Sequence, residues 1–213
     1  MRAVNLKAKR QGWIALGAMT ALAALLFYLA FGYSGGNFWL KIAATALILT
    51  ITSLFLRPPV PGGLAFRPKD LVLGLASAAV LWLIFWLAKG VSAWMLPALA
   101  NQVGDIYAKG QGTPQWLIAP LLFFIIGPCE ELFWRRYMQA GLMERLGPLK
   151  GWLCATGLYT LVHLPSLNIM LMGAAAVAGA FWGLLYWRWG RIPPVIVSHA
   201  FWTTTAFVVF PIP

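Results

Sequence analysis

The chain has 213 residues, of which 61% are hydrophobic and only 10% are charged. Soluble domains are about 45–50% apolar and about 25% charged, so this composition excludes an ordinary water-soluble globule. A disordered chain is also excluded, because disordered segments lack apolar residues in this amount. The formal net charge of +11 would suggest nucleic acid in a soluble protein, but in a membrane protein basic residues mark the cytoplasmic loops. The sequence therefore predicts an all-α, polytopic transmembrane helical bundle without a nucleic-acid partner.

About seven apolar segments have the length of membrane-spanning helices, since a span needs roughly 20 predominantly apolar residues. They lie, in chain order, at 12–31, 38–56, 70–96, 115–143, 150–165, 168–187 and 192–210. The third and fourth are longer than a bilayer requires, so we expect them to tilt, kink or protrude. No separable soluble segment interrupts the series, and the sequence predicts a single membrane domain over residues 1–213.

Lysine and arginine residues concentrate in alternate connections between these segments. The basic connections hold Arg2, Lys7, Lys9, Arg10, Arg57, Arg67, Lys69, Arg145, Lys150, Arg188 and Arg191. The opposite connections hold few basic residues, among them Lys41, Lys89 and Lys109. Because cytoplasmic loops carry the excess of basic residues, this alternation predicts a cytoplasmic N-terminus and a C-terminus outside. The short basic chain is bacterial in style, which predicts an integral protein of the bacterial inner (plasma) membrane.

Acids and histidines are scarce, so their positions carry most of the functional information. Glu130 and Glu131 are adjacent inside the fourth apolar segment, where inserting one acid costs about 2.5–3.5 kcal/mol. Glu131 and Arg135 are four residues apart, which puts a carboxylate and a guanidinium on one helix face. Glu130 points about 100° away around the helix and has no obvious partner. His163 and His199, the chain's two histidines, lie in two further apolar segments.

Three helices can thus bring one acid and two imidazoles around a single water-filled pocket. A carboxylate in such a pocket can act as a general base, and imidazoles can orient water or donate to an oxyanion. An acid and two histidines also form the ligand set of a catalytic zinc site, although an HExxH motif is absent. Serine catalysis is disfavoured, because Ser198 adjoins His199, no GxSxG motif occurs and no acid obviously orients the imidazole.

In the sixth segment, Gly179 and Gly183 form a GxxxG pattern. Small residues at this spacing let helix backbones approach closely. We expect close packing inside the bundle, with a homodimer face as the alternative, and the oligomeric state stays open.

The order of these motifs resembles that of the CAAX protease and bacteriocin-processing (CPBP, also called ABI) family of intramembrane proteases. The family motifs are EExxxR, FxxxH and HxxxN or HxxxD, and the matching residues are Glu130, Glu131, Arg135, His163 and His199. Two positions depart from the family pattern: Tyr159 replaces the Phe of the second motif, and Thr203 replaces the Asn or Asp of the third. The resemblance covers the region 115–210.

The resemblance implies a glutamic-type intramembrane endopeptidase, a family formerly classed as metalloproteases. Glu130 would activate water, His163 would help to hold that water, and His199 would stabilise the tetrahedral oxyanion. The implied mechanism needs no metal or other cofactor, although the residues themselves leave zinc open.

Further residues would support this site. The resemblance implies that Glu131 and Arg135 form a structural pair that positions the catalytic helix. Thr203 would support the oxyanion with one donor where an amide offers two. The catalytic core would be 115–210, preceded by accessory spans in 1–114.

The expected partner is a membrane-anchored peptide or protein substrate in the lipid bilayer. The resemblance favours processing of membrane-anchored precursors at C-terminal sorting or leader segments over CAAX-type cleavage of prenylated proteins. Two alternatives stay open: a catalytically silent immunity or scaffold protein of the same fold, and a proton-coupled carrier, which would also hold acids and histidines at membrane depth.

Overall fold

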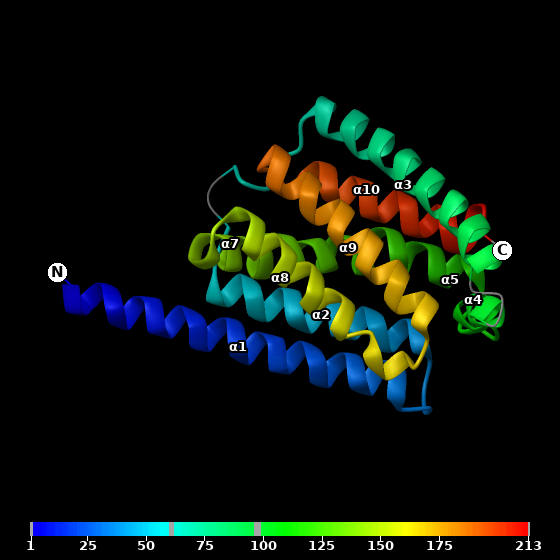
Figure 1. The fold of residues 1–213 in the computed structure, drawn as a ribbon, viewed down its shortest axis with the longest axis horizontal. Coiled ribbons are helices and arrows are strands. Elements are labelled where there is room, and N and C mark those ends of the chain that lie inside the picture. Colours follow the sequence, from blue (N-terminus) through cyan, green and yellow to red (C-terminus); the bar gives the residue numbers. More distant parts are fainter. Residues whose placement is uncertain (1, 60–61, 96–98, 213) are drawn as a thin grey trace.

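The computed structural model describes residues 2–59, 62–95 and 99–212, with side chains from residue 11 onward except those of residues 93 and 100. Over these ranges the chain is all-helical and has no strand, which confirms the predicted fold class. The helices lie along the long axis of the molecule, and the two chain ends lie at opposite ends of it (Figure 1). The predicted basic cluster of Arg2, Lys7, Lys9 and Arg10 lies outside the described side chains.

The helical elements follow one another with short connections. They are α1 Arg2–Gly32, α2 Phe38–Leu56, α3 Pro68–Met95, α4 Ala100–Ala108, α5 Gln115–Pro120, η2 Leu121–Ile126, α6 Gly127–Glu131, η3 Leu132–Gln139, α7 Ala140–Leu146, α8 Pro148–Leu161, η4 Leu164–Ser166, α9 Ile169–Trp189, α10 Pro193–Thr204 and η5 Thr205–Val209. Elements α5 to α7 form one continuous rod.

Five described stretches are long and apolar enough to cross a membrane: Gln11–Gly32, Phe38–Leu56, Pro68–Ser92, Gln115–Leu146 and Ile169–Trp189. Their outward faces are apolar, with Phe55 83% and Phe124 72% exposed. Apolar side chains on that scale at the surface are what a lipid-facing helix requires. The chain is therefore an integral membrane protein by length and composition.

The segments predicted at 150–165 and 192–210 form helices, but these are shorter than full spans. Helix α8 has 14 residues, and α10 has 12 residues before it widens into η5. A straight span needs about 20. Apolar residues continue beyond α8, but Pro165 lies in a 3₁₀ turn and Leu167 adopts a left-handed conformation with φ 51°. Five of the about seven predicted segments are thus long enough to span by themselves, and the other two form the shorter helices α8 and α10 with η5.

The rod from α5 to α7 changes its winding on both sides of α6. Gly127 N–H donates to Leu122 O and Ala140 N–H donates to Arg135 O, five residues back in each case. This is π-helical hydrogen bonding, which is frequent at functional sites. Pro128 contributes to it, because proline has no N–H and its ring displaces the carbonyl four residues earlier. The two adjacent glutamates lie in the short α-helical turn between the two π segments.

Glycines allow close contacts between neighbouring helices. A Cβ added at Gly127 would lie 3.1 Å from both Cα and N of Ala200, so α6 and α10 nearly touch. Between α9 and α8, a Cβ at Gly179 would lie 2.9 Å from Tyr159 Cδ1 and one at Gly183 would lie 2.8 Å from Trp152 Cδ1. The GxxxG pattern therefore serves packing inside the bundle, as expected.

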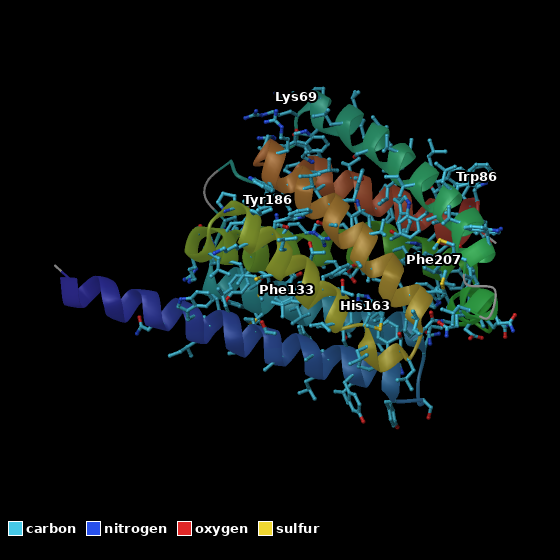
Figure 2. The ribbon with its side chains drawn as sticks, viewed as in Figure 1. Lys69, Trp86, Phe133, His163, Tyr186 and Phe207 are labelled. Carbon is cyan, nitrogen blue, oxygen red and sulfur yellow. The ribbon has the colours of Figure 1, made fainter. Side chains whose placement is uncertain are left out.

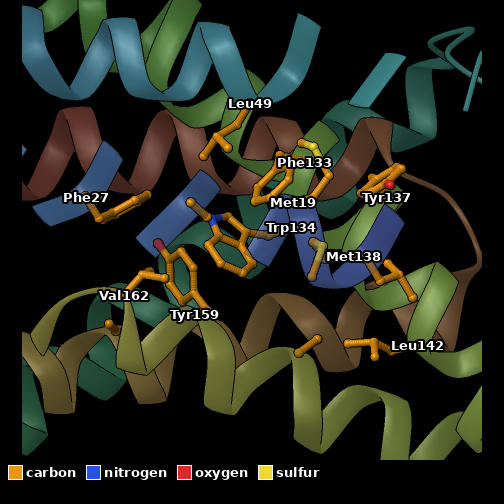
Figure 3. Packing of buried hydrophobic residues seen from close by; sticks show 14 residues of the cluster. Met19, Phe27, Leu49, Phe133, Trp134, Tyr137, Met138, Leu142, Tyr159 and Val162 are labelled. Atoms are coloured by element: carbon orange, nitrogen blue, oxygen red, sulfur yellow. The ribbon is translucent and has the colours of Figure 1, made fainter. Parts of the chain in front are cut away.

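An aromatic cluster fills the space between α1, η3 and α8. Phe27, Trp134 and Tyr159 are among its buried members (Figure 3). The Trp134 and Tyr159 rings meet edge to face with centroids 5.3 Å apart. Such pairs add about 0.5–1.5 kcal/mol beyond the buried area. The cluster fixes the position of Tyr159, which belongs to the site described next.

Candidate active site

A cavity of about 460 Å³ lies inside the bundle with a mostly apolar wall. Glu130, His163 and His199 all line it, and their side chains are buried, with exposed fractions of 7%, 7% and 2%. His163 lies in the turn after α8 rather than within the helix, and its ring is in the interior (Figure 2). The structure thus brings together the acid and the two imidazoles that the sequence placed in separate segments.

Glu130 has a partner that the sequence analysis did not find. The Tyr159 hydroxyl donates a 2.8 Å hydrogen bond to Glu130 Oε2. Tyr159 stands where the family motif has Phe. The hydroxyl that Tyr adds at this position was the feature of the sequence that could have indicated a partner for Glu130. This bond uses Oε2 and leaves Oε1 without a hydrogen-bond partner among the described residues.

The ring of His163 is held in one orientation by the same residue. Its Nδ1 lies 2.8 Å from the backbone oxygen of Tyr159, and a carbonyl oxygen only accepts, so Nδ1 carries the hydrogen. The rings of Phe27 and Phe31 flank the imidazole, with centroids 5.1 and 5.6 Å away. In its neutral form His163 therefore presents Nε2 as a hydrogen-bond acceptor.

His199 is oriented by Glu131. Its Nδ1 lies 2.6 Å from Glu131 Oε1, and Arg135 Nη1 lies 3.0 Å from the same oxygen. The predicted Glu131–Arg135 ion pair is confirmed, whereas the statement that no acid orients this histidine is wrong. Helix spacing reveals partners on the same helix, but the contact to His199 crosses from α6 to α10. It depends on the close approach of Gly127 to α10.

Aromatic rings enclose the charged pair. The Trp182 ring stacks on the His199 ring with centroids 3.8 Å apart and an interplanar angle of 14°. The guanidinium carbon of Arg135 lies 4.8 Å from the Tyr159 ring centroid and 5.5 Å from that of Trp182. Arginine stacks well on aromatic faces, where a desolvated cation gains about 2 kcal/mol or more. Arg135 thereby contacts both the partner of Glu130, Tyr159, and the partner of His199, Glu131.

Thr203 and Ser198 have their hydroxyl groups committed elsewhere. Thr203 lines the cavity, but its hydroxyl donates to the backbone oxygen of His199 at 2.8 Å, within its own helix. The single O–H of Thr203 is therefore used within α10, and its oxygen can only accept a hydrogen bond from a group in the cavity. Ser198 accepts a 3.2 Å hydrogen bond from Trp182 Nε1, and the partner of His199 Nδ1 is Glu131 instead.

The described residues do not fit a metal site. No group of three His, Cys, Asp or Glu side chains among them has the arrangement to hold an ion. Independence of metal stays a prediction.

Fold and site define a polytopic helical membrane protein with a buried acid–imidazole cavity. Residues 112–205 match the family model of type II CAAX prenyl endopeptidase Rce1-like proteins, so this part of the chain is similar to that family. The match contains every motif residue named above and confirms the resemblance to the CPBP family. It supports a CAAX-type intramembrane endopeptidase in general terms. No curated protein and no solved structure matches the chain.

Proposed function

We propose that this protein is a glutamic-type intramembrane endopeptidase in which Glu130 activates water to hydrolyse a peptide bond. The observation that carries the proposal is the shared cavity: Glu130, His163 and His199 come from three separate parts of the chain and line one buried space. Ionisable side chains at membrane depth are costly and usually functional. An acid and two imidazoles around one cavity supply groups that can activate water and stabilise an oxyanion.

Glu130 acts as the general base. The Tyr159 hydroxyl holds Oε2, and Oε1 takes a proton from water as the water oxygen attacks the carbonyl carbon. The other O–H of that water donates a hydrogen bond to His163 Nε2, which is free to accept it because Nδ1 is fixed on a backbone oxygen. Positioned general bases contribute about 10²–10⁴ in rate. The proton then passes from Glu130 to the departing amine.

His199 stabilises the oxyanion. Its Nδ1–H is held by Glu131, so Nε2 is the nitrogen that faces the substrate. When the ring carries both protons, Nε2–H donates to the developing oxyanion, and the Glu131 carboxylate balances the charge of the imidazolium. Glu131 and Arg135 are thus supporting residues. Thr203 is proposed as a structural support of His199 rather than as a donor, since its proton is used within α10.

The proposed substrates are membrane-anchored protein precursors that carry C-terminal sorting or leader segments. The apolar wall of the cavity suits a segment taken from the bilayer, and its size is that of pockets for small ligands, about 300–1,000 Å³. Following the basic residues, the N-terminus is cytoplasmic and the C-terminus outside, in a bacterial inner membrane. The family description favours a second candidate, CAAX-type cleavage of prenylated proteins.

The test compares cells that carry the native chain, Glu130→Gln or Glu144→Gln. Glu144 is the matched control, because its ion pair with Arg57 is at the surface. Mass spectrometry of membrane-protein termini should find precursors that accumulate with Glu130→Gln and are processed normally with Glu144→Gln. Identical termini in all three strains would reject the protease and favour a silent immunity or scaffold protein.

A further inference from the structure

A hydroxyl group of α2 reaches the backbone next to the candidate general base. Thr50 Oγ1 donates a 2.7 Å hydrogen bond to the backbone oxygen of Cys129, the residue before Glu130. Thr50 is only 4% exposed, and it does not line the cavity. It also lies outside the region that matches the family model, which begins at residue 112. A helix predicted as an accessory span therefore contacts the backbone of the candidate active site.

Helix α2 runs parallel to the rod from α5 to α7 in a fixed register. Arg136 Nη2 donates a 2.9 Å hydrogen bond to the backbone oxygen of Arg57, at the end of α2. Thr50 and Cys129 are 79 residues apart, and so are Arg57 and Arg136. The two contacts are thus seven residues apart on each helix, which is about two turns. Along the rod they lie before and after the two adjacent glutamates, so α2 is fixed to the rod on both sides of them.

The carbonyl of Cys129 lies where the rod changes its winding. Cys129 belongs to the short α-helical turn α6, and the Leu132 N–H that reaches its oxygen is shared with Pro128 O. Buried backbone carbonyls need a donor, and the Thr50 hydroxyl supplies one next to the π-helical segment. The Cys129 C=O and the Glu130 N–H belong to one planar peptide group. The bond from Thr50 therefore fixes the peptide plane from which Glu130 projects.

We infer that Thr50 is a positioning residue for Glu130 and that α2 is part of the catalytic unit. This inference rests on the proposed function, because it assigns a role in that reaction. Tyr159 orients the carboxylate end of Glu130, and Thr50 orients its backbone. Small displacements of a positioned group reduce rates strongly. Loss of the Thr50 hydroxyl therefore slows the chemical step and leaves substrate binding intact, since Thr50 is not in the cavity wall.

Steady-state cleavage of a fluorogenic membrane peptide by the full-length protein in vesicles tests this role, at a temperature well below the unfolding of every variant. Thr50→Val keeps the shape of the side chain and removes the donor, so kcat should fall about tenfold with KM unchanged. Thr50→Ser keeps the hydroxyl and should retain most of the native kcat. A merely structural role would lower the melting temperature of Thr50→Val and leave kcat of the folded protein unchanged, and this result would overturn the inference.

Thr45→Val is the matched control. Thr45 lies on the same helix and is also 4% exposed, but its hydroxyl donates to the backbone oxygen of Leu26, on α1, at 3.5 Å. The control should keep the native kcat. An equal fall of kcat in Thr45→Val and Thr50→Val would show a general effect of losing a buried hydroxyl on α2, and it would overturn the positioning role.

Isotope-edited infrared spectroscopy tests the contact without any cleavage. The chain has two cysteines, Cys129 and Cys154, so a Cys154→Ala protein labelled with ¹³C-carbonyl cysteine reports the Cys129 carbonyl alone. Because a hydrogen bond lowers the amide I frequency, the labelled band should move to higher frequency in Thr50→Val and stay in place in Thr50→Ser. An unmoved band in Thr50→Val would overturn the inference.

The native rate separates this inference from the proposed function. A native chain that cleaves no peptide would reject the proposed function itself. A native chain that cleaves, with Thr50→Val equally active, would reject only the positioning role of Thr50.

Discussion

The hydroxyl of Tyr159 donates a 2.8 Å hydrogen bond to Glu130 Oε2, at the wall of the cavity inside the bundle. The same residue receives the Nδ1–H of His163 on its backbone oxygen. One side chain and its own carbonyl thus orient both groups that would hold the attacking water. Tyr159 therefore acts as a positioning residue, and it occupies a place where the family motif has phenylalanine.

Tyr159→Phe should lower kcat by about 10- to 100-fold with little change in KM. A buried hydrogen bond to a charged group is worth about 1.5–3 kcal/mol, and the ring itself is retained. Steady-state kinetics with a membrane peptide measure the two constants. Tyr137→Phe is the control, because it removes a hydroxyl from the same aromatic cluster away from the cavity. A kcat unchanged in Tyr159→Phe would contradict the positioning role.

Arg135→Ala should lower both thermal stability and activity. Its guanidinium is 2% exposed and pairs with a fully buried Glu131, and removal of one partner from a buried pair costs about 3–5 kcal/mol. Thermal unfolding in detergent measures this directly. Arg57→Ala, in an exposed pair with Glu144, should cost about 0–1 kcal/mol. Unchanged melting with lost turnover would instead make Arg135 a purely catalytic residue.

Gly127→Ala should disturb the site without changing any of its polar side chains. The new Cβ would lie 3.1 Å from the Ala200 backbone, so α10 must shift and the Glu131–His199 contact must lengthen. We expect a loss of at least tenfold in kcat/KM, since small displacements of positioned groups reduce rates strongly. Gly157→Ala is the control, because nothing lies within 4 Å of its Cβ. Equal activity of the two variants would show that the close contact between α6 and α10 at Gly127 does not position the site.

The sequence predicts those parts of the structure that depend on neighbours along one helix. Apolar composition identifies the membrane fold, and the four-residue spacing of Glu131 and Arg135 identifies their ion pair. Contacts between helices depend on their relative register, which the spacing along one chain does not contain. The bonds from Tyr159 to Glu130 and from His199 to Glu131 are of this second kind.

Hydropathy overestimates the length of α8 for a related reason. Apolar residues continue past Leu161, so hydropathy extends the segment to 165, but Pro165 and the left-handed Leu167 end the helix earlier. Hydropathy does not distinguish apolar residues that face lipid from those buried inside the protein. A turn made of apolar residues is therefore counted as part of a span. His163 lies in that turn rather than in a helix, and from there its ring reaches the cavity.

The most direct measurement is the cleavage rate of a fluorogenic membrane peptide by purified protein in vesicles, after exhaustive removal of metals by chelation. The native chain should keep its full rate, and Glu130→Gln should lose at least about 99% of it while it melts at the same temperature, as expected when a general base worth about 10²–10⁴ is removed. A native rate that disappears on chelation and returns only with zinc, or an active Glu130→Gln variant, would contradict hydrolysis by glutamate-activated water.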